Sequence, residues 1–169
     1  MTAASELKAR PAPRVLIRIF WSAHRAVFRL TGGRFGVTSP QAGKRFGMLR
    51  LETVGRRTGK PRATMVGYYD DGPNLVTMAM NGWGQGEPAW WLNLQARPDA
   101  TVTLPGGRRD VRARVATGAE RDRLWAKFRE YPGWGENLDG LAAVRGTETA
   151  VIVLEPRSAA PVPSEEGNE

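Results

Sequence analysis

The sequence predicts a mainly β protein (an α+β chain), built as an antiparallel barrel with peripheral helices. Two observations carry this prediction. About six short strand-like runs, several of them alternating between apolar and polar residues, are separated by turn-forming residues at hairpin spacing. Few stretches show the period of about 3.6 residues that a helix requires. The 12 prolines and 20 glycines agree with many turns between short elements.

The composition describes one globular domain with a surplus of positive charge. The chain has 169 residues, 41% hydrophobic and 25% charged, which is enough to bury a sizeable core. Cysteine is absent and His24 is the single histidine, so disulfides, thiol nucleophiles and metal sites built on cysteine or several histidines are excluded. A Ser-His-Asp triad is disfavoured for the same reason. The net charge of +8 predicts attraction to anionic ligands, lipids or nucleic acid. Any chemistry therefore depends on a borrowed cofactor or proceeds without an acid–base histidine.

Residues 14–30 predict an amphipathic helix with one basic face. Arginines gather on that face: Arg14, Arg18, Arg25 and Arg29. Two interpretations stay open, a helix packed on the domain core and a helix lying on an anionic membrane surface. The segment is too short and too charged to span a bilayer. We divide the chain into an N-terminal part (residues 1–43), a barrel domain (44–156) and a disordered tail (157–169).

The strand series begins at residues 46–53, where Leu49, Leu51 and Thr53 share one face. A basic turn between two glycines, residues 55–62 (GRRTGKPR), leads to a second strand at residues 63–69.

A strong hairpin signal, DDGPN at residues 70–74, leads to a third strand at residues 75–80. Residues 81–87 hold three glycines and predict a loop. Pro88 suits the first turn of a helix that runs to about residue 96.

The second half of the chain predicts two more strands, a helix and a buried strand. Residues 101–104 and 108–116 form a hairpin in which Val111, Ala113 and Val115 face inward. Residues 117–120 match a capping box that opens a helix to about residue 130. Residues 148–154 (ETAVIVL) are nearly all apolar, which is typical of a strand covered on both faces.

The basic turn and the segment PAWWLNL at residues 88–94 are the candidate site. Glycines beside arginines leave backbone N–H groups and guanidinium groups free to bind an anion. At most one of the two adjacent tryptophans can face a ligand if both lie on one short helix. Together the two segments predict a site for an anionic and planar ligand. Taken singly, a basic turn of this kind is more often a solvated hairpin, and a tryptophan pair is more often core packing.

Three segments resemble the deazaflavin-dependent nitroreductase family. They are TVGRRTGKPR at residues 53–62, PAWWLNL at residues 88–94 and VIVLEP at residues 151–156, with the first two at matching separation. The resemblance covers roughly residues 15–156. It implies a split β-barrel of the FMN-binding type and an oxidoreductase. Such an enzyme transfers a hydride from reduced coenzyme F420 to a quinone-like, nitro-aromatic or other unsaturated acceptor.

The resemblance also implies which residues bind the coenzyme. Residues of the basic turn would hold its phosphate and acidic tail or shape the turn around them: Arg56, Arg57, Thr58, Gly59 and Arg62. Four others would line the deazaflavin ring: Met65, Met80, Asn81 and Trp90. Asn93 would help fix the helix that carries Trp90. The protein's share in hydride transfer is then positioning and electrostatics.

The chain departs from the family near the ring. Some relatives carry serine and lysine where Met80 and Asn81 stand, and some carry tyrosine at the position of Trp134. Trp134 can stack on an acceptor but has no hydroxyl, whereas Tyr131 has one. We therefore place Tyr131 and Trp134 in the acceptor pocket without naming a catalytic residue, and water is the alternative proton donor.

The expected partners follow from the same resemblance. In some relatives the N-terminal helix associates with membrane and the acceptor is a quinone, which agrees with the basic face at residues 14–30. We expect a cytoplasmic protein, peripheral on the inner face of the cell membrane, that forms a homodimer and needs no metal. Two alternatives stay open: a split-barrel enzyme using FMN or another planar anionic cofactor, and a non-enzymatic basic module that binds anionic lipid or nucleic acid. Nucleic-acid binding is disfavoured because the arginines of residues 108–114 alternate with valine and alanine rather than with aromatic residues.

Overall fold

A computed structural model describes residues 36–135 and 137–157. The predicted helix at residues 14–30, His24 and the predicted tail beyond residue 157 lie outside the described residues. These predictions, and the three-part division of the chain with them, stay predictions.

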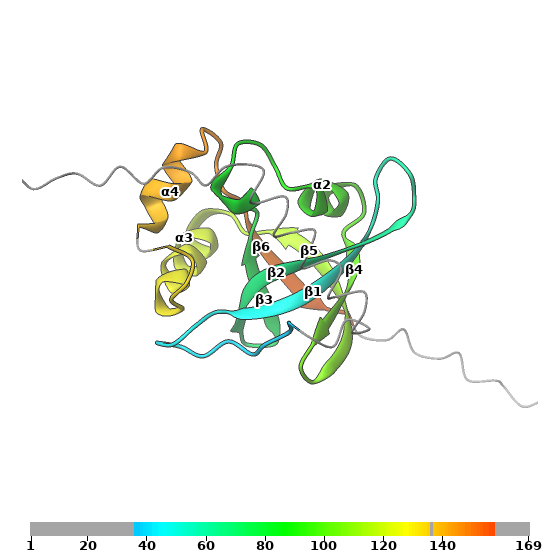
Figure 1. The fold of residues 1–169 in the computed structure, drawn as a ribbon, viewed down its shortest axis with the longest axis horizontal. Helices are drawn as coiled ribbons and strands as arrows, with labels where there is room; N and C mark the ends of the chain where they lie inside the picture. The colour runs from blue at the N-terminus through cyan, green and yellow to red at the C-terminus, as the bar shows by residue number, and fades with distance from the viewer. Residues whose placement is uncertain (1–35, 136, 158–169) are drawn as a thin grey trace, which may run out of the picture. The chain divides into compact units, whose positions relative to one another are not determined.

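Six antiparallel strands close into a barrel in the order β1-β2-β3-β6-β5-β4, with β1 pairing with β4 (Figure 1). Their bounds are β1 (Gly47–Val54), β2 (Pro61–Asp71), β3 (Asn74–Met78), β4 (Asp99–Leu104), β5 (Gly107–Val115) and β6 (Val151–Pro156). The predicted antiparallel barrel is confirmed. The hairpin signal also forms as expected, because Asp71 pairs with Asn74 and Gly72 takes the left-handed φ of 63° that the turn requires.

Helices and 3-10 turns surround the barrel: η1 (Asn81–Trp83), α2 (Ala89–Ala96), α3 (Gly118–Lys127), η2 (Phe128–Glu130) and α4 (Leu138–Val144). Helix α2 lies where the sequence predicts it, with Pro88 as its N-cap. The predicted helix to residue 130 is confirmed in its first part and ends as the 3-10 turn η2. The sequence did not predict α4, which has seven residues including a glycine and shows no clear period.

Alternation along the strands separates the apolar residues into two clusters. The inner cluster fills the barrel and is covered by Trp91 and Leu94 of α2. The outer cluster lies between β2, β3 and β6 and the segment from α3 to α4. Its aromatic members are Tyr69, Trp125, Phe128, Tyr131 and Trp134. Strand β6 contributes to both clusters, which explains its nearly continuous apolar sequence.

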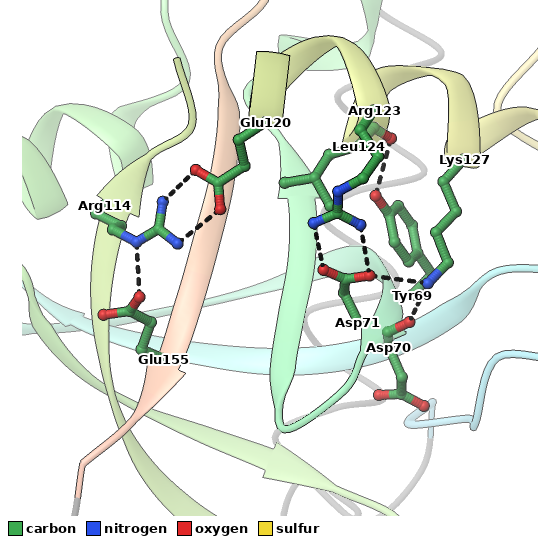
Figure 2. Close-up of polar contacts among 9 residues, drawn as sticks. All are labelled: Tyr69, Asp70, Asp71, Arg114, Glu120, Arg123, Leu124, Lys127 and Glu155. Carbon is green, nitrogen blue, oxygen red and sulfur yellow. Dashed lines mark hydrogen bonds and ion pairs between the residues drawn. The ribbon is translucent and has the colours of Figure 1, made fainter. Parts of the chain in front are cut away.

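Polar contacts hold α3 against the end of β2 (Figure 2). The buried Tyr69 hydroxyl donates to the carbonyl of Leu124 at 2.8 Å, and burial raises the pKa of that phenol. Asp71 accepts hydrogen bonds from Arg123 at 3.0 and 2.9 Å and from Lys127 at 2.9 Å. The hydrogen bonds from Arg123, followed by the one from Lys127, lower the pKa of Asp71 to about 2 despite partial burial.

Two local predictions for the second half of the chain are wrong. Thr117 is the N-cap of α3, but its side chain makes no capping hydrogen bond. The carboxylate of Glu120 instead accepts hydrogen bonds from both Nη atoms of Arg114, at 2.7 and 2.8 Å. Nε of Arg114 donates to the carboxylate of Glu155 at 2.6 Å (Figure 2). A bidentate pair with a guanidinium outcompetes a hydrogen bond to one backbone amide. Val115, expected inward, is 42% exposed because it is the last residue of β5.

Candidate functional site

The turn between β1 and β2 is closed by its own backbone. The N–H of Gly55 donates to the carbonyl of Lys60 at 2.9 Å, and the N–H of Gly59 donates to the carbonyl of Gly55 at 2.8 Å. Gly59 has a left-handed φ of 65°. A Cβ on Gly55 would lie 3.1 Å from Oγ1 of Thr58 and 3.2 Å from the Lys60 carbonyl oxygen. Glycine at these two positions therefore permits the tight turn.

The basic side chains of this turn are exposed and make no ion pair with any carboxylate in the described part of the chain: Arg56, Arg57, Lys60 and Arg62. Two arginines of β5, by contrast, are paired with carboxylates. Arg108 pairs with Glu52 at 2.6 Å, and Arg112 pairs with Asp99 at 2.9 Å. A group of uncompensated cations on a preformed turn fits a ligand with several negative charges.

Asn93 connects α2 to this turn. Its side chain is 6% exposed, its Oδ1 accepts from the backbone N–H of Arg56 at 3.1 Å, and its Nδ2 donates to Oγ1 of Thr53 at 3.2 Å. Figure 1 shows α2 between the β1–β2 turn and the loop that follows β3. The two motifs of the sequence therefore meet through one buried carboxamide.

The adjacent tryptophans of α2 have different surroundings. Trp91 is 7% exposed and belongs to the inner cluster, whereas Trp90 is half-buried and packs against that cluster. Their ring centroids lie 6.5 Å apart with an angle of 61° between the planes. Trp90 is therefore the tryptophan that keeps part of its ring accessible to a ligand.

Met65 and Met80 each lie four residues beyond the last residue pair that joins β2 to β3, Tyr69 and Val76. The ladder between these strands joins Asp71 to Asn74 and Tyr69 to Val76 and extends no further toward the basic turn. The same register, continued, would set Met65 opposite Met80. Met65 is 9% exposed and Met80 is half-buried against the outer cluster. We call this stretch the open ladder between β2 and β3.

The segment after Met80 has an unusual backbone. Asn81 and Trp83 have positive φ values of 46° and 62°, and Gly82 between them has a φ of 60°. Such a conformation is unfavourable for residues with a Cβ, and it persists where surrounding contacts hold it, often at functional sites. The side chain of Asn81 donates to the carbonyl of Gln85 at 3.1 Å, and Trp83 packs against the outer cluster.

Tyr131 and Trp134 both lie in the outer cluster. Tyr131 is 9% exposed and stacks on Tyr69 with ring centroids 5.2 Å apart. Trp134 is 4% exposed, and its ring centroid lies 4.4 Å from that of Phe46. The buried indole N–H of Trp134 has no hydrogen-bond partner among the described residues. The cluster also contacts Met80, so the structure brings these aromatic residues and one candidate ring residue into the same packing unit. Their role toward an acceptor stays a prediction.

Arg145 is a residue beside this site that the sequence did not single out. It is 1% exposed and binds the loop between η1 and α2. An isolated arginine after a short, weakly periodic segment has the sequence pattern of a surface residue.

Two further kinds of site were sought in the described residues. They contain no group of three or more His, Asp or Glu side chains that could hold a metal ion. No helix described in the structure is long and apolar enough to cross a bilayer.

Comparison with known proteins identifies the family of the chain. The chain matches the family model described as F420H(2)-dependent quinone reductase over residues 16–156. It is 35% identical over 104 residues to an F420H(2)-dependent quinone reductase of Mycobacterium tuberculosis H37Rv, an alignment that covers 60% of this chain and 68% of that protein.

Two solved structures are similar in fold. An F420-H2 dependent reductase has a TM-score of 0.56 at 22% identity, over 71% of this chain and 100% of the other. A structure described as a domain-swapped dimer has a TM-score of 0.58 at 21% identity, over 82% and 99% of the two chains. The split β-barrel is thus confirmed, and the family match favours F420 over FMN and over a non-enzymatic module. The chain belongs to the F420H2-dependent quinone reductase family, and it is an oxidoreductase that passes a hydride from reduced coenzyme F420 to a quinone.

Proposed function

We propose that the β1–β2 turn binds the phosphate and the acidic tail of F420. The observation that carries this assignment is the set of exposed cations on the turn, among them Arg57 and Arg62, that make no ion pair within residues 36–135 and 137–157. A phosphate followed by carboxylates needs several charge-assisted donors close together, and each guanidinium presents two parallel N–H groups. Asn93 supports the assignment because it holds the turn through the backbone of Arg56 and leaves the arginine side chains free.

The deazaflavin ring would then be held at the open ladder between β2 and β3 by Met65, Met80, Asn81 and Trp90. Methionine side chains are polarizable and adapt to a flat ring. The half-buried Trp90 adds an aromatic face and helps to exclude water. A ring and a charged tail would thus be held by two separate parts of the site, one apolar and one cationic.

When bound in its reduced form, F420 supplies a hydride. Reduction of a quinone to a hydroquinone takes one hydride and one proton, so the protein must place the acceptor against the ring and admit a proton. Met80 and Asn81 carry no acid that titrates near neutral pH. Tyr131 carries a hydroxyl, but it is stacked in the outer cluster. We therefore propose that water delivers the proton, with Tyr131 as the residue to test against it.

Parallel titrations with oxidised F420 and FMN, followed by tryptophan fluorescence, test the coenzyme assignment. We expect a dissociation constant on the order of micromolar or lower for F420 and much weaker binding of FMN. Turnover of reduced F420 with a water-soluble naphthoquinone, compared with a nitroaromatic compound, tests the preferred acceptor. Tighter binding of FMN would contradict the coenzyme assignment, and faster reduction of the nitroaromatic compound would contradict the preference for quinones.

We further propose that residues 14–30 bind the cytoplasmic face of an anionic membrane, because a helix over this segment, as the sequence predicts, would gather four arginines on one side. The full chain should float with anionic vesicles more than with neutral ones, and a chain lacking residues 1–30 should not. Equal flotation of both chains would identify the segment as a packing element.

A homodimer, which split barrels often form, is tested separately by light scattering of the purified protein.

A further inference from the structure

Arg145 follows α4 and binds a segment whose two acceptor carbonyls lie 59 and 61 positions earlier in the chain. Its guanidinium is buried, and all three nitrogen atoms donate hydrogen bonds. Nε donates to the carbonyl of Gly84 at 3.2 Å, and one Nη donates to the carbonyl of Gly86 at 2.8 Å. The other Nη donates to Oγ1 of the buried Thr149 at 2.8 Å. Two of its three bonds therefore go to the backbone of one loop.

The positive charge of this guanidinium has only a distant negative charge beside it in the described part of the chain. Glu87 approaches it at 4.0 Å, and Oε2 of the same carboxylate is buried without a hydrogen-bond partner among the described residues. Burial of a charged group is unfavourable unless hydrogen bonds satisfy it. Here the carbonyl groups of the loop accept those hydrogen bonds. Because the buried guanidinium of Arg145 would lose these bonds if the loop moved, it holds the loop in one conformation.

The loop needs such an anchor because its first residues are strained. Asn81 and Trp83 have left-handed backbones. Within the loop, the N–H of Gly84 donates to the carbonyl of Asn81 at 3.1 Å, and the side chain of Asn81 donates to the carbonyl of Gln85 at 3.1 Å. These bonds link the loop to itself. Arg145, the C-cap of α4, links the loop to that helix and to Thr149, which precedes β6.

We infer that Arg145 is a positioning residue for hydride transfer, because it holds residues 81–87 in the conformation that sets Met80 and Asn81 beside the deazaflavin ring. This inference rests on the proposed function for its account of Met80 and Asn81. Arg145 itself touches neither coenzyme nor acceptor and acts through the loop. Lysine cannot replace it, because one ammonium group lacks the planar set of donors that reaches three acceptors in different directions.

Hydrogen exchange of the coenzyme-free protein tests the anchor without any ligand. In Arg145→Lys, which keeps the charge and so favours folding, amides of residues 81–87 should exchange about tenfold faster while amides of β1 and β6 stay protected. Thr149→Val should give a smaller increase in the same residues, since it removes one of the three acceptors. Arg129→Lys is the matched control, because Arg129 is exposed and pairs with Asp139 at 2.6 Å. Unchanged exchange at residues 81–87 in Arg145→Lys would overturn the inference.

Single-turnover kinetics test the positioning role. At saturating reduced F420 and a water-soluble naphthoquinone, Arg145→Lys should slow hydride transfer by about 10- to 100-fold, because small displacements of a reacting group have effects of this size. Its dissociation constant for F420 should change less than about threefold, since the basic turn is untouched. Arg57→Ala should show the reverse pattern, with weaker binding and a preserved rate at saturation.

A purely structural role would make the exchange faster and leave the rate of hydride transfer unchanged, and that result would refute the inference while leaving the coenzyme site intact. Wild-type protein that fails to bind F420 would instead overturn the proposed function. The exchange experiment would still show, in that case, whether Arg145 holds the loop.

Discussion

The buried carboxamide of Asn93 accepts a hydrogen bond from the backbone N–H of Arg56 at 3.1 Å. This bond joins the short helix α2 to the exposed turn between β1 and β2, 37 positions away in the sequence. The conformation of the cationic turn consequently depends on a residue that carries no charge and that lies on the helix of Trp90.

Replacing Asn93 with leucine should therefore weaken coenzyme binding although the cations remain. The variant keeps the volume but leaves the Arg56 N–H without its acceptor, which should lower the free energy of unfolding by about 1–3 kcal/mol. We expect the dissociation constant for F420 to rise about tenfold in fluorescence titrations. Asn137→Ala removes an exposed side chain that caps α4 and should lower stability by about 1 kcal/mol without affecting F420. Equal F420 affinity in Asn93→Leu and the wild type would show that the turn does not need this bond.

The double variant Arg57→Ala/Arg62→Ala tests the anion site directly. Loss of two charge-assisted hydrogen-bonding groups should weaken F420 binding by a few kcal/mol, in a protein that remains folded. The slope of log Kd against log salt concentration should also decrease, because fewer charges contact the ligand. Arg108→Ala/Arg112→Ala changes the net charge equally but removes arginines that are already paired. If both double variants lose the same affinity, net charge rather than a specific site attracts the coenzyme.

The pKa of Asp71 predicts a dependence of stability on pH. Because the hydrogen bonds of Arg123 and Lys127 lower this pKa from 3.8 to about 2, the carboxylate stabilises the folded state above about pH 4, and the contribution is lost as pH falls toward 2. It amounts to about 1–2 kcal/mol once the exposure of Arg123 is considered. Urea unfolding should show that Asp71→Asn loses less stability than the wild type between about pH 5 and about pH 2.5. Parallel pH profiles for the two proteins would refute this.

Gly67 tests whether Trp134 is fixed by packing. A Cβ on Gly67 would lie 2.6 Å from Cη2 of the Trp134 ring and 3.1 Å from Cδ2 of Phe46. Gly67→Ala should therefore lower the free energy of unfolding by about 1–3 kcal/mol, and by less in a Trp134→Leu background. Gly106→Ala is the control, because its Cβ would meet nothing within 4 Å and its stability should change by less than about 0.5 kcal/mol. Equal effects of Gly67→Ala in the two backgrounds would mean that Trp134 moves aside freely, as a residue of an adaptable acceptor pocket would.

The parts of the fold with a local signal could be predicted from the sequence. The turn at Gly72 and the proline before α2 each act on their immediate neighbours, so the hairpin and the helix lie where their residues indicate. The pairing of β1 with β4 joins distant strands, and only the expectation of a closed barrel pointed to it. At Glu120 the local pattern was misleading. The residues match a capping box, but the Glu120 carboxylate binds Arg114 of β5 instead of capping α3.

The candidate site divides in the same way. Arginines between glycines and a tryptophan pair on a short helix are visible as patterns, and the structure joins the two segments through Asn93. The burial of Arg145 depends on a loop far earlier in the chain, so its own neighbours in sequence say nothing of it. The strain at Asn81 and Trp83 is likewise a product of the surrounding fold.

The open ladder between β2 and β3 has a consequence for the lifetime of the protein. The two strands pair from Tyr69 to Asp71 and then part, so this side of the barrel has fewer backbone bonds to resist opening. A ligand that contacts both strands replaces the missing bonds and stabilises the closed form by RT ln(1 + [L]/Kd). The melting temperature should consequently rise with F420 concentration, and in a cell the supply of coenzyme would govern how long each molecule escapes proteolysis.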